Sequence, residues 1–474
     1  MSTTIVYAIP NCNTVKKALD WMKANKKAYS FHDYKKQGIT SAQLTSWAKQ
    51  VGWEALINKK GTTWKLLGPE VQATITNQKA AIALMAEKTS VIRRPLIEQN
   101  GKIIALGFDE AEYKKSQNYK ATNYKFGLLT SSFSILLTLG FLWFDGFELV
   151  DNIARNYSEN SIIVALIFFG IIMIGSDILT TPFSYYSTFV IEEKFGFNKT
   201  TIKTFFLDKI KGWLMMAVVG GGILALIIWF YGATGQNFWL YAWGLVAVFT
   251  LFMNMFYSKL IVPLFNKQTP LEEGTLRDKI SEYAKSVGFK LDKIFVIDGS
   301  KRSTKANAYF SGFGSEKRVT LYDTLINDLD DEEIVAVLAH EVGHYKKKHI
   351  IFNLFASILL TGLTLYILSL FISNPLLSQA LGVDIPSFHI GLIAFGLLYS
   401  PISEITGLIM HLFSRKFEYQ ADDYAKNTYK GEPLITSLKK LSKNSLSNLT
   451  PHPAYVFMHY SHPTLLERIV NLRK

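Results

Sequence analysis

Two histidines and a glutamate lie close together in the segment LAHEVGH at 338–344. His340 and His344 are four residues apart, so on a helix both imidazoles project from one face and can bind one tetrahedral zinc ion. Glu341 lies about 100° round such a helix from His340. There it would lie near the metal without binding it. A general base needs this position in order to deprotonate the water that the metal activates. The pattern predicts two ligands and the base of a zinc hydrolase.

The residues around this motif predict a helix. Acidic residues at 331–333 precede an apolar run with helical periodicity, and basic residues follow it, as the helix dipole favours. We expect the helix to continue into the membrane span that follows. The alternative interpretation is a surface helix whose histidines bind no metal.

A catalytic zinc needs a third protein ligand, with its fourth position left for water. The helical segment SRKFEYQADDYAK places Glu418 and Asp422 on one face, four residues apart. Glu418 is the predicted ligand, and Asp422 is predicted to accept a hydrogen bond from one histidine and orient it. Taken alone, this segment would also fit a solvated charged helix face.

The C-terminal segment SHPTLLER carries His462 and Arg468. A metalloprotease must neutralise charge on a tetrahedral intermediate, and both side chains can stabilise an oxyanion or hold a peptide carbonyl. Two solvent-exposed polar side chains with no part in catalysis would fit the sequence equally well.

The elements that must position these residues belong to a largely apolar chain. Of its 474 residues 49% are hydrophobic, which is above the norm for soluble proteins and predicts membrane spans. Six spans of ~20 residues are predicted. They lie at 126–144, 161–180, 212–232, 237–258, 350–373 and 387–412. His389, Pro401 and Glu404 in the last span favour a broken or cavity-lining helix.

The charges of the loops predict the orientation. Segment 114–125 carries four lysines, whereas loop 145–159 carries four acidic residues and one arginine. Because cytoplasmic loops are enriched in Lys and Arg, the N-terminal region is predicted cytoplasmic, as are residues 259–349 and the tail after about 413. The net charge of +13 follows from such membrane flanks, so we do not predict a nucleic-acid partner.

Residues 1–115 have a soluble composition and predict a small α/β domain, joined by a linker at 116–124 to the membrane region at 125–474. Strands are expected at 4–9 and 29–34, with a helix at 13–25 between them. Asn100-Gly101 predicts a hairpin turn between strands at 95–97 and 102–106. The opening residues show no signal-peptide pattern.

Cys12 is the single cysteine of the chain, which excludes an intrachain disulfide and fits a reducing compartment. It precedes a predicted helix, whose dipole would lower its pKa together with Lys16. Cys12 is therefore a candidate redox nucleophile, with glutathione as the resolving thiol and Arg94 as an anion-binding partner. The alternative is an inert domain.

From about residue 119 to 474 the sequence resembles the type I CAAX prenyl endopeptidases, membrane-embedded relatives of the gluzincin proteases. The resemblance rests on several motifs in the same order, which are more specific than any single one. They are FGFNKTT at 195–201 followed by Asp208 and Lys209, NAYFSGFG at 307–314, LAHEVGH at 338–344, SRKFEYQAD at 414–422 and SHPTLLER at 461–468.

This resemblance implies a helical barrel that encloses a chamber in the bacterial inner membrane or endoplasmic reticulum. It implies one zinc ion per chain, with a peptide or protein substrate that can carry a lipid, and contact with membrane lipid. The roles that it implies are zinc ligation by His340, His344 and Glu418, catalysis by Glu341, orientation by Asp422, backbone pairing with substrate by Asn307, Ala308, Tyr309 and Phe310, and contacts of His462 and Arg468 with substrate or transition state. An exposed strand edge binds many peptides through main-chain hydrogen bonds.

Members of that family usually begin with a further transmembrane helix, giving seven, and residues 1–115 stand in its place. These residues resemble the ArsC/Spx-like group of thioredoxin-fold proteins through YAIPNCNTVKKALDW, FHDYKK and RRPL at 93–96. Loss of one span would leave the N-terminus in the cytoplasm, where such a domain folds in its reduced form.

Two alternative functions compete with a CAAX-type protease. The first is a thiol-redox protein, or an arsenate-reducing one as the ArsC resemblance implies, that uses Cys12 and carries an inactive membrane domain. The second is an HtpX-like quality-control protease, which differs in substrate and not in chemistry. The FGFN segment and the number of spans argue against the second.

Overall fold

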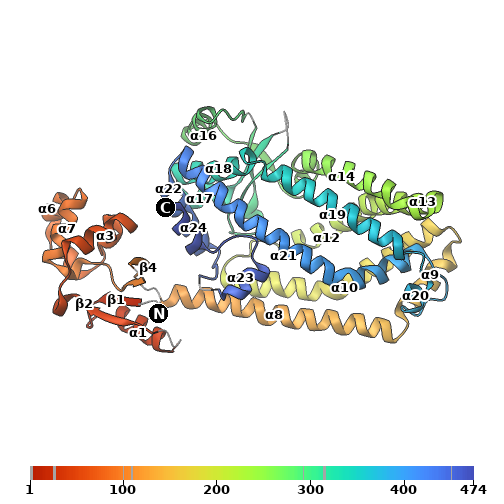
Figure 1. Cartoon of the computed structure of the whole chain (residues 1–474), viewed down its shortest axis with the longest axis horizontal. Helices are drawn as coiled ribbons and strands as arrows, with labels where there is room; N and C mark the ends of the chain where they lie inside the picture. The colour runs from red at the N-terminus through yellow and green to blue at the C-terminus, as the bar shows by residue number, and fades with distance from the viewer. Residues whose placement is uncertain are drawn as a thin grey trace. The chain divides into compact units, whose positions relative to one another are not determined.

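The computed structural model describes residues 4–24, 28–99, 101–107, 110–291, 293–312, 317–449 and 451–474. The chain forms two compact units, with the boundary between Asn118 and Tyr119 (Figure 1). The residues predicted as a linker at 116–124 are helical, and they lie within the long helix α8 (Glu110–Trp143).

The first unit is built on a four-stranded sheet with the order β2-β1-β3-β4. Strand β1 (Thr4–Ala8) pairs in parallel with β2 (Ser30–Asp33), because helix α1 (Asn13–Ala24) returns the chain between them. Strand β3 (Leu96–Gln99) is antiparallel to both β1 and β4 (Lys102–Leu106). The α/β prediction is confirmed. Gly101 has the positive φ of 77° that a tight turn requires, while Asn100 lies outside the described residues.

The core of this unit lies between the sheet and two helices, α3 (Ser41–Val51) and α7 (Gln78–Glu87). Trp47 is fully buried there, and its indole N–H donates to Glu98 at 2.8 Å. The unit also contains the shorter helices α2 (Tyr34–Gln37), α4 (Trp53–Leu56), α5 (Thr62–Lys65), α6 (Gly68–Thr74) and η1 (Thr89–Val91).

The second unit has five helical segments that are long and apolar enough to cross a membrane, counted among the described residues. They are Lys114–Trp143, Ser161–Phe195, Ile202–Phe265, His349–Phe371 and Phe388–Thr428. The third segment has 64 residues. As one straight helix it would be about 96 Å long, whereas a bilayer core is ~30 Å thick. It bends back at η4 (Gly235–Asn237), where Gly235 has a φ of 56°. Six crossings therefore stay a prediction.

These segments contain the helices that form the barrel. They are α8, α10 (Ser161–Tyr186), α12 (Ile202–Met215), α13 (Gly221–Thr234), α14 (Phe238–Leu260), α19 (His349–Phe371) and α21 (Phe388–Thr428). The π-helical turns η2 (Ser187–Glu192) and η3 (Met216–Gly220) and the short helices α11 (Glu193–Phe195) and α15 (Val262–Phe265) complete them.

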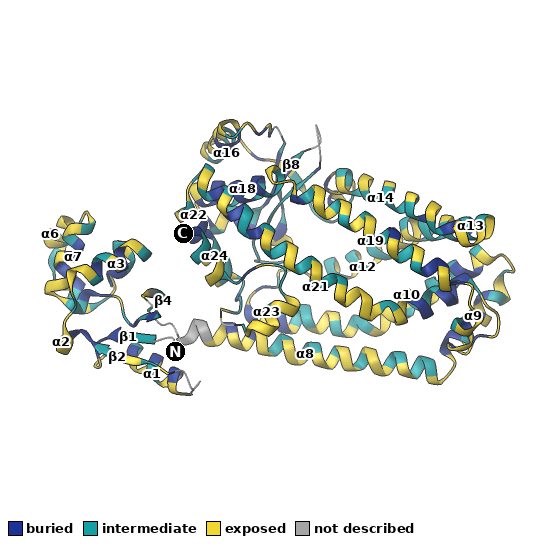
Figure 2. Ribbon diagram, in the orientation of Figure 1, coloured by how far each residue is buried: buried dark blue, intermediate teal, exposed yellow. Residues whose placement is uncertain are grey.

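Contacts between neighbouring helices close a ring. Helix α10 contacts α13, and the ring continues through α14, α19 and α21 back to α10. Helix α8 packs beside α10, where Phe133 contacts Phe183 at 4.8 Å. At most 17% of the apolar window of any segment is buried within the protein, and Figure 2 shows exposed residues along these helices. Such uncovered apolar surface is typical of helices that face lipid.

The last span is not a broken helix, so that half of the expectation is wrong, and a cavity-lining helix stays a prediction. Helix α21 runs without interruption for 41 residues and passes through Pro401. Proline removes one backbone donor and crowds the preceding turn, yet the helix is continuous here, and it is packed at both ends. At one end His389 is buried and lies 2.7 Å from Asp151 of α9 (Gly146–Tyr157), beside α20 (Pro375–Gln379). At the other end the helix packs against α18 (Asp331–Lys346).

The rest of the second unit is a smaller α/β portion. Its sheet has the order β5-β6-β8-β7, with strands β5 (Gln268–Pro270), β6 (Ile294–Ile297), β7 (Ala308–Ser311) and β8 (Arg318–Tyr322). Strand β7 lies at one edge. The helices are α16 (Thr275–Ser286), α17 (Asp323–Asp328), α18, α22 (Gly431–Asn444), α23 (Pro453–His459) and α24 (Leu465–Leu472), with the turn η5 (Gly299–Lys301). One apolar core joins the sheet to α16, α18 and α22.

Candidate metal centre

Helix α18 carries the HEVGH motif and begins at a well-formed cap. The Asp330 side chain accepts from the backbone N–H of Glu333 at 3.0 Å, and the Glu333 carboxylate accepts from the backbone N–H of Asp330 at 3.0 Å. This capping box satisfies donors that the first helical turn leaves open. The helix ends at Lys346, and Lys348 adopts a φ of 61°. The expectation that α18 continues into the next span is therefore wrong, because this left-handed residue turns the chain before α19.

Helices α18 and α21 approach each other at Gly343. A Cβ atom at this position would lie 3.1 Å from both Cα and O of Ala421, closer than ordinary van der Waals contact. Only glycine permits this spacing without a shift of backbone. Since Gly343 lies between the two histidines of the motif, the contact brings Glu418 of α21 opposite them.

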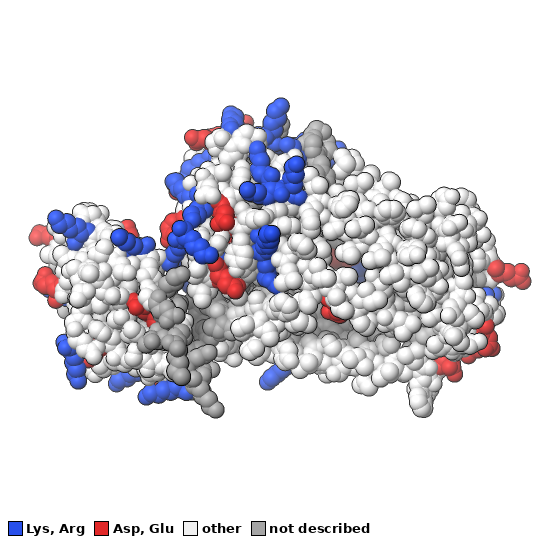
Figure 3. Space-filling view, viewed as in Figure 1, with Lys and Arg blue, Asp and Glu red and all other residues white. Residues whose placement is uncertain are grey.

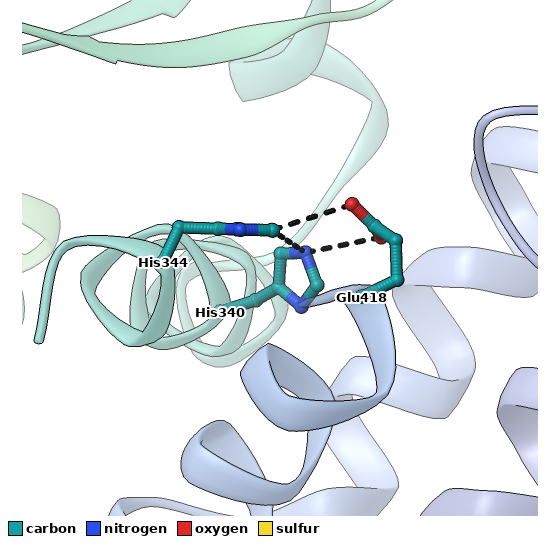
Figure 4. A group of neighbouring side chains, drawn as sticks. All are labelled: His340, His344 and Glu418. Atoms are coloured by element: carbon teal, nitrogen blue, oxygen red, sulfur yellow. Dashed lines mark hydrogen bonds and ion pairs between the residues drawn. The ribbon is translucent and has the colours of Figure 1, made fainter. Parts of the chain in front are cut away.

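The three predicted ligands lie together (Figure 4). The Nε2 atoms of His340 and His344 are 3.1 Å apart. The Glu418 carboxylate lies 3.4 Å from Nε2 of His340 and 3.3 Å from Nε2 of His344. His340 and Glu418 are buried, with 7% and 4% of their surfaces exposed.

Asp422 lies behind His340, with its carboxylate 2.9 Å from Nδ1. Arg468 holds this carboxylate through two hydrogen bonds of 2.9 and 2.6 Å. Burial alone would lower the pKa of His340, but hydrogen bonds to the Asp422 and Glu418 carboxylates raise it to about 9. A carboxylate accepts and does not donate, so Nδ1 of His340 carries a hydrogen and Nε2 faces the other two predicted ligands.

When both histidines are neutral and their Nδ1 atoms carry the hydrogens, the Nε2 lone pairs and the Glu418 carboxylate face one another within one group. The Oε2 atom of Glu418 is buried and accepts no hydrogen bond from any residue that the structure describes, although a guanidinium nitrogen of Arg468 lies 3.2 Å away. A buried acceptor without a donor is costly. Two imidazole Nε2 atoms at 3.1 Å likewise repel each other unless a proton or a cation lies between them. The donor set fits a metal ion.

Glu341 does not belong to this group of three. It is half-buried on the same helix. Burial raises the pKa of its carboxyl above the ordinary value, while the neighbouring His340 and His344 act in the opposite direction. A carboxylate with a raised pKa is a stronger base than an ordinary one, and once protonated it retains the proton nearer to neutral pH, where it can pass it on.

His462 and Arg468 reach the centre from the C-terminal segment. Nε2 of His462 lies 3.3 Å from Glu418, and its side chain is 60% exposed. The Arg468 side chain is 11% exposed and pairs with Asp422 and Glu418. Arg468 thus lies behind the ligands, whereas His462 lies at the open side.

Strand β7 lies beside the motif helix, where the Phe310 ring contacts that of Tyr345 at 5.2 Å. Asn307 O accepts from Tyr322 N of β8 at 3.1 Å, so by alternation Ala308 and Phe310 direct their backbone groups to the free edge. The Ala308 N–H donates to the Asn307 side chain at 2.9 Å. The last two residues of the NAYFSGFG segment lie outside the described residues.

The sequence analysis missed His349, which contacts His344, and Gln420, which contacts His349. Nδ1 of His344 lies 3.0 Å from Nδ1 of His349, and Nε2 of His349 lies 2.8 Å from Oε1 of Gln420. The only signal in the sequence is a further histidine five positions after His344, which a continuous helix would have turned away from the site.

In the first unit, Cys12 and Arg94 also lie together. Burial acts to raise the pKa of the Cys12 thiol, but hydrogen bonds from the Val15 backbone and from Arg94, with the charge of Arg94, lower it overall. The backbone N–H of Lys16 donates to Cys12 O at 2.9 Å, which places Cys12 at the start of α1. The Arg94-Pro95 peptide bond is cis.

Comparison with known proteins divides the chain in the same way. A family model described as CAAX prenyl protease N-terminal, five membrane helices, matches residues 99–267. Peptidase family M48 matches residues 270–474, and the ArsC family matches residues 7–116.

Individual relatives extend these matches over most of the chain. A CAAX prenyl protease 1 homolog of Oryza sativa subsp. japonica is 40% identical over 367 residues, covering 76% of this chain and 86% of that protein. The CAAX prenyl protease 1 homolog of Homo sapiens is 32% identical over 411 residues, covering 77% and 86%. The crystal structure of Ste24p from S. mikatae superposes with a TM-score of 0.74 at 36% identity, covering 77% of this chain and 90% of that one.

Proposed function

The chain belongs to the CAAX prenyl proteases of peptidase family M48, and from that premise we propose that it uses zinc to cleave lipid-bearing peptides at the cytoplasmic membrane face. It is an integral membrane metalloendopeptidase that acts on a peptide or protein. Its relatives do not support the alternative of an inactive membrane domain. The convergence of His340, His344 and Glu418 is the observation that carries the proposal.

Zinc suits this donor set better than other common metals. Ligands at the bond lengths that zinc forms with nitrogen and oxygen, in a tetrahedron, lie about 3.3–3.5 Å from one another. The two imidazole Nε2 atoms are 3.1 Å apart, and the Glu418 carboxylate lies 3.4 Å from that of His340 through Oε2 and 3.3 Å from that of His344 through Oε1. Two imidazoles and one carboxylate favour zinc over calcium or magnesium, which prefer oxygen ligands. With three protein ligands, a fourth position is left for the reaction.

The residues around the ligands divide the work of hydrolysis. When bound, zinc supplies Lewis-acid chemistry that lowers the pKa of water and polarises a peptide carbonyl. Glu341 takes the proton from the attacking water and passes it to the leaving amine, as its raised pKa permits. His462, which is exposed beside Glu418, donates to the oxyanion that forms on the substrate carbonyl. Arg468 holds Asp422, so its role is to keep His340 in position.

Strand β7 is proposed to hold the substrate. Its free edge presents the carbonyl of Ala308 and both backbone groups of Phe310, so an extended peptide could pair there as a further strand. A scan of N-methylated peptides would test this. Each peptide in the scan carries one N-methyl group. Cleavage should fall at every second position along the peptide, because alternate amides of an added strand face β7. A uniform response along the peptide would exclude strand addition.

The charge distribution supports a cytoplasmic active site. Within the second unit, Figure 3 shows Lys and Arg side chains over the sheet and α16, and acidic side chains over the end that carries α9. Positive charge favours the cytoplasmic side. Spans beside the metal centre would contact membrane lipid and the lipid of a substrate. We infer a prenylated CAAX peptide as substrate from the names of the relatives.

Zinc content and peptide cleavage, measured together, test the whole proposal. Purified protein should contain about one zinc per chain, as a single three-ligand site requires, and should cleave a prenylated CAAX peptide. Glu341→Gln should retain zinc and lose cleavage. Glu332→Gln is the matched control on the same helix, because Glu332 is exposed and pairs only with the surface residue Lys430 in the described structure. Full cleavage by Glu341→Gln would refute the mechanism.

We propose a second, separate function for the first unit, because Arg94 and the start of α1 lower the pKa of Cys12. The Cys12 thiolate would attack oxidised glutathione, forming a mixed disulfide and releasing one glutathione thiolate. Mass measurement of the intact chain would detect the adduct, and Cys12→Ser should not form it. Equal rates of adduct formation with and without Arg94→Gln would contradict this proposal.

A further inference from the structure

A chain of hydrogen bonds leads away from His344 on the side opposite the metal position. His344 Nδ1 lies 3.0 Å from His349 Nδ1, and His349 Nε2 lies 2.8 Å from Gln420 Oε1. His349 is 3% exposed, and its ring stacks on Phe417 with centroids 4.2 Å apart and planes 10° apart. The ring of His349 therefore has one fixed orientation.

Each hydrogen in this chain can be assigned from its end. The Oε1 atom of Gln420 accepts and does not donate, so His349 Nε2 must carry a hydrogen. In a neutral His349, Nδ1 is then an acceptor, and His344 Nδ1 must donate to it. Neutral His344 is left with a lone pair on Nε2, which is the atom that faces His340 and Glu418. The chain thus selects the tautomer that can bind a metal.

The opposite orientation of the Gln420 amide would reverse every assignment. An amide N–H₂ in place of Oε1 would donate to His349 Nε2 and move the hydrogen of His349 to Nδ1. His344 Nδ1 would then accept, and its hydrogen would lie on Nε2, where it blocks metal binding. Metal binding by His344 Nε2 therefore requires that Gln420 presents Oε1, and not its amide nitrogen, to His349 Nε2.

We propose that His349 and Gln420 are positioning residues that hold His344 in the metal-binding tautomer and ring orientation, as Asp422 does for His340. Partners of this kind orient metal-binding histidines and raise their basicity. The inference rests on the proposed zinc site. The two histidines would differ in kind of support, because His340 donates to a carboxylate and His344 to a neutral imidazole.

The left-handed residue Lys348 makes this arrangement possible. It ends α18 and starts α19 in a new direction at His349, with a φ of 61°. In a continuous helix, His349 would lie five residues after His344, about 500° round the axis, and so about 140° away from it. The break brings the two rings to 5.1 Å between centroids.

Zinc dissociation constants of the full-length protein, measured by chelator competition, test the proposal without relying on activity. His349→Phe retains an aromatic ring on Phe417 but has no acceptor, so zinc affinity should fall roughly 10- to 100-fold. His349→Asn places an amide oxygen near the position of Nδ1 and should lose less. Gln420→Glu retains an acceptor and should bind zinc at least as tightly as the wild type, whereas Gln420→Leu should bind it more weakly. The expected order of affinity is Gln420→Glu, wild type, His349→Asn, His349→Phe.

A purely structural role for His349 predicts the opposite order for its two variants, because His349→Phe would retain zinc affinity and His349→Asn would lose it. That result would overturn the proposal. Thermal unfolding of the metal-free variants checks that each is folded. If His349→Phe does not fold, the comparison of Gln420→Glu with Gln420→Leu decides, and equal affinities overturn the proposal. A wild-type protein that binds no zinc would instead refute the proposed function, so the two failures are distinguishable.

Discussion

The close approach of α18 and α21 at Gly343 makes metal affinity sensitive to a single methyl group. Gly343→Ala would place a Cβ atom 3.1 Å from Ala421 Cα, Ala421 O and Tyr424 Cβ. Two of these atoms are backbone and cannot rotate away, so the helices must separate by a few tenths of an ångström. The separation acts on the ligand set directly, because Glu418 is on one helix and both histidines are on the other.

The size of the effect follows from the energy of overpacking. Insertion of a methyl group into a packed interior typically costs ~1–3 kcal/mol. In the metal-free protein the helices can relax apart, and alanine in place of glycine favours the helix by up to ~1 kcal/mol. Bound zinc would draw the helices together again, so the strain falls on metal binding. A loss of ~1–3 kcal/mol is roughly a 5- to 150-fold rise in the zinc dissociation constant.

Chelator competition on the purified variant measures this constant, and thermal unfolding without metal shows whether the fold is retained. Gly396→Ala is the matched control. It lies on α21, and a Cβ there would meet no atom within 4 Å, so zinc affinity should not change. If Gly343→Ala bound zinc as tightly as Gly396→Ala, the helix spacing would not control the centre.

Three further predictions concern the two sites. Asp422→Asn should lower zinc affinity roughly 10- to 100-fold by weakening the support of His340. Asp423→Asn alters an exposed contact to Asn471 and should leave the affinity unchanged in the same chelator titration. Alkylation of Cys12, the single cysteine, should persist to lower pH than that of a free cysteine, because a lowered pKa keeps the reactive thiolate populated as pH falls. Arg94→Gln should move the midpoint of the alkylation profile to higher pH, and an unchanged midpoint would contradict Arg94 as a cause of the lowered pKa. Chelation of the metal should abolish peptide cleavage, reversibly on adding zinc, and leave the rate of Cys12 alkylation unchanged; a changed rate would show that the two sites are coupled.

Local patterns in the sequence were sufficient for much of the site. The spacing of His340 and His344 is a property of any helix, and the acidic cap with its apolar run identifies the helix from residues within one or two turns. Glu418 could be proposed because metal chemistry demands a third ligand. Apolar blocks of spanning length identify membrane helices without any tertiary contact, since the bilayer sets their length.

Other features depend on contacts between segments that are far apart in the chain. No pattern near Pro401 indicates that α21 continues through it, although the helix does so for its full length. The role of Gly343 appears only when Ala421 lies against it. His349 reaches His344 because one left-handed residue, Lys348, redirects the chain, and lysine carries no strong preference for that conformation.

The sequence by itself determined the chemistry available to this protein: the donors, the base, the apolar spans and the separate thiol domain. These depend on residue type and on the fixed periods of helix and bilayer. Only the tertiary structure decided how the donors are held, with Asp422 and Arg468 behind His340 and with His349 and Gln420 behind His344. Hydrogen-bond partners are set by distances of a few ångströms between segments whose separation along the chain carries no information about them.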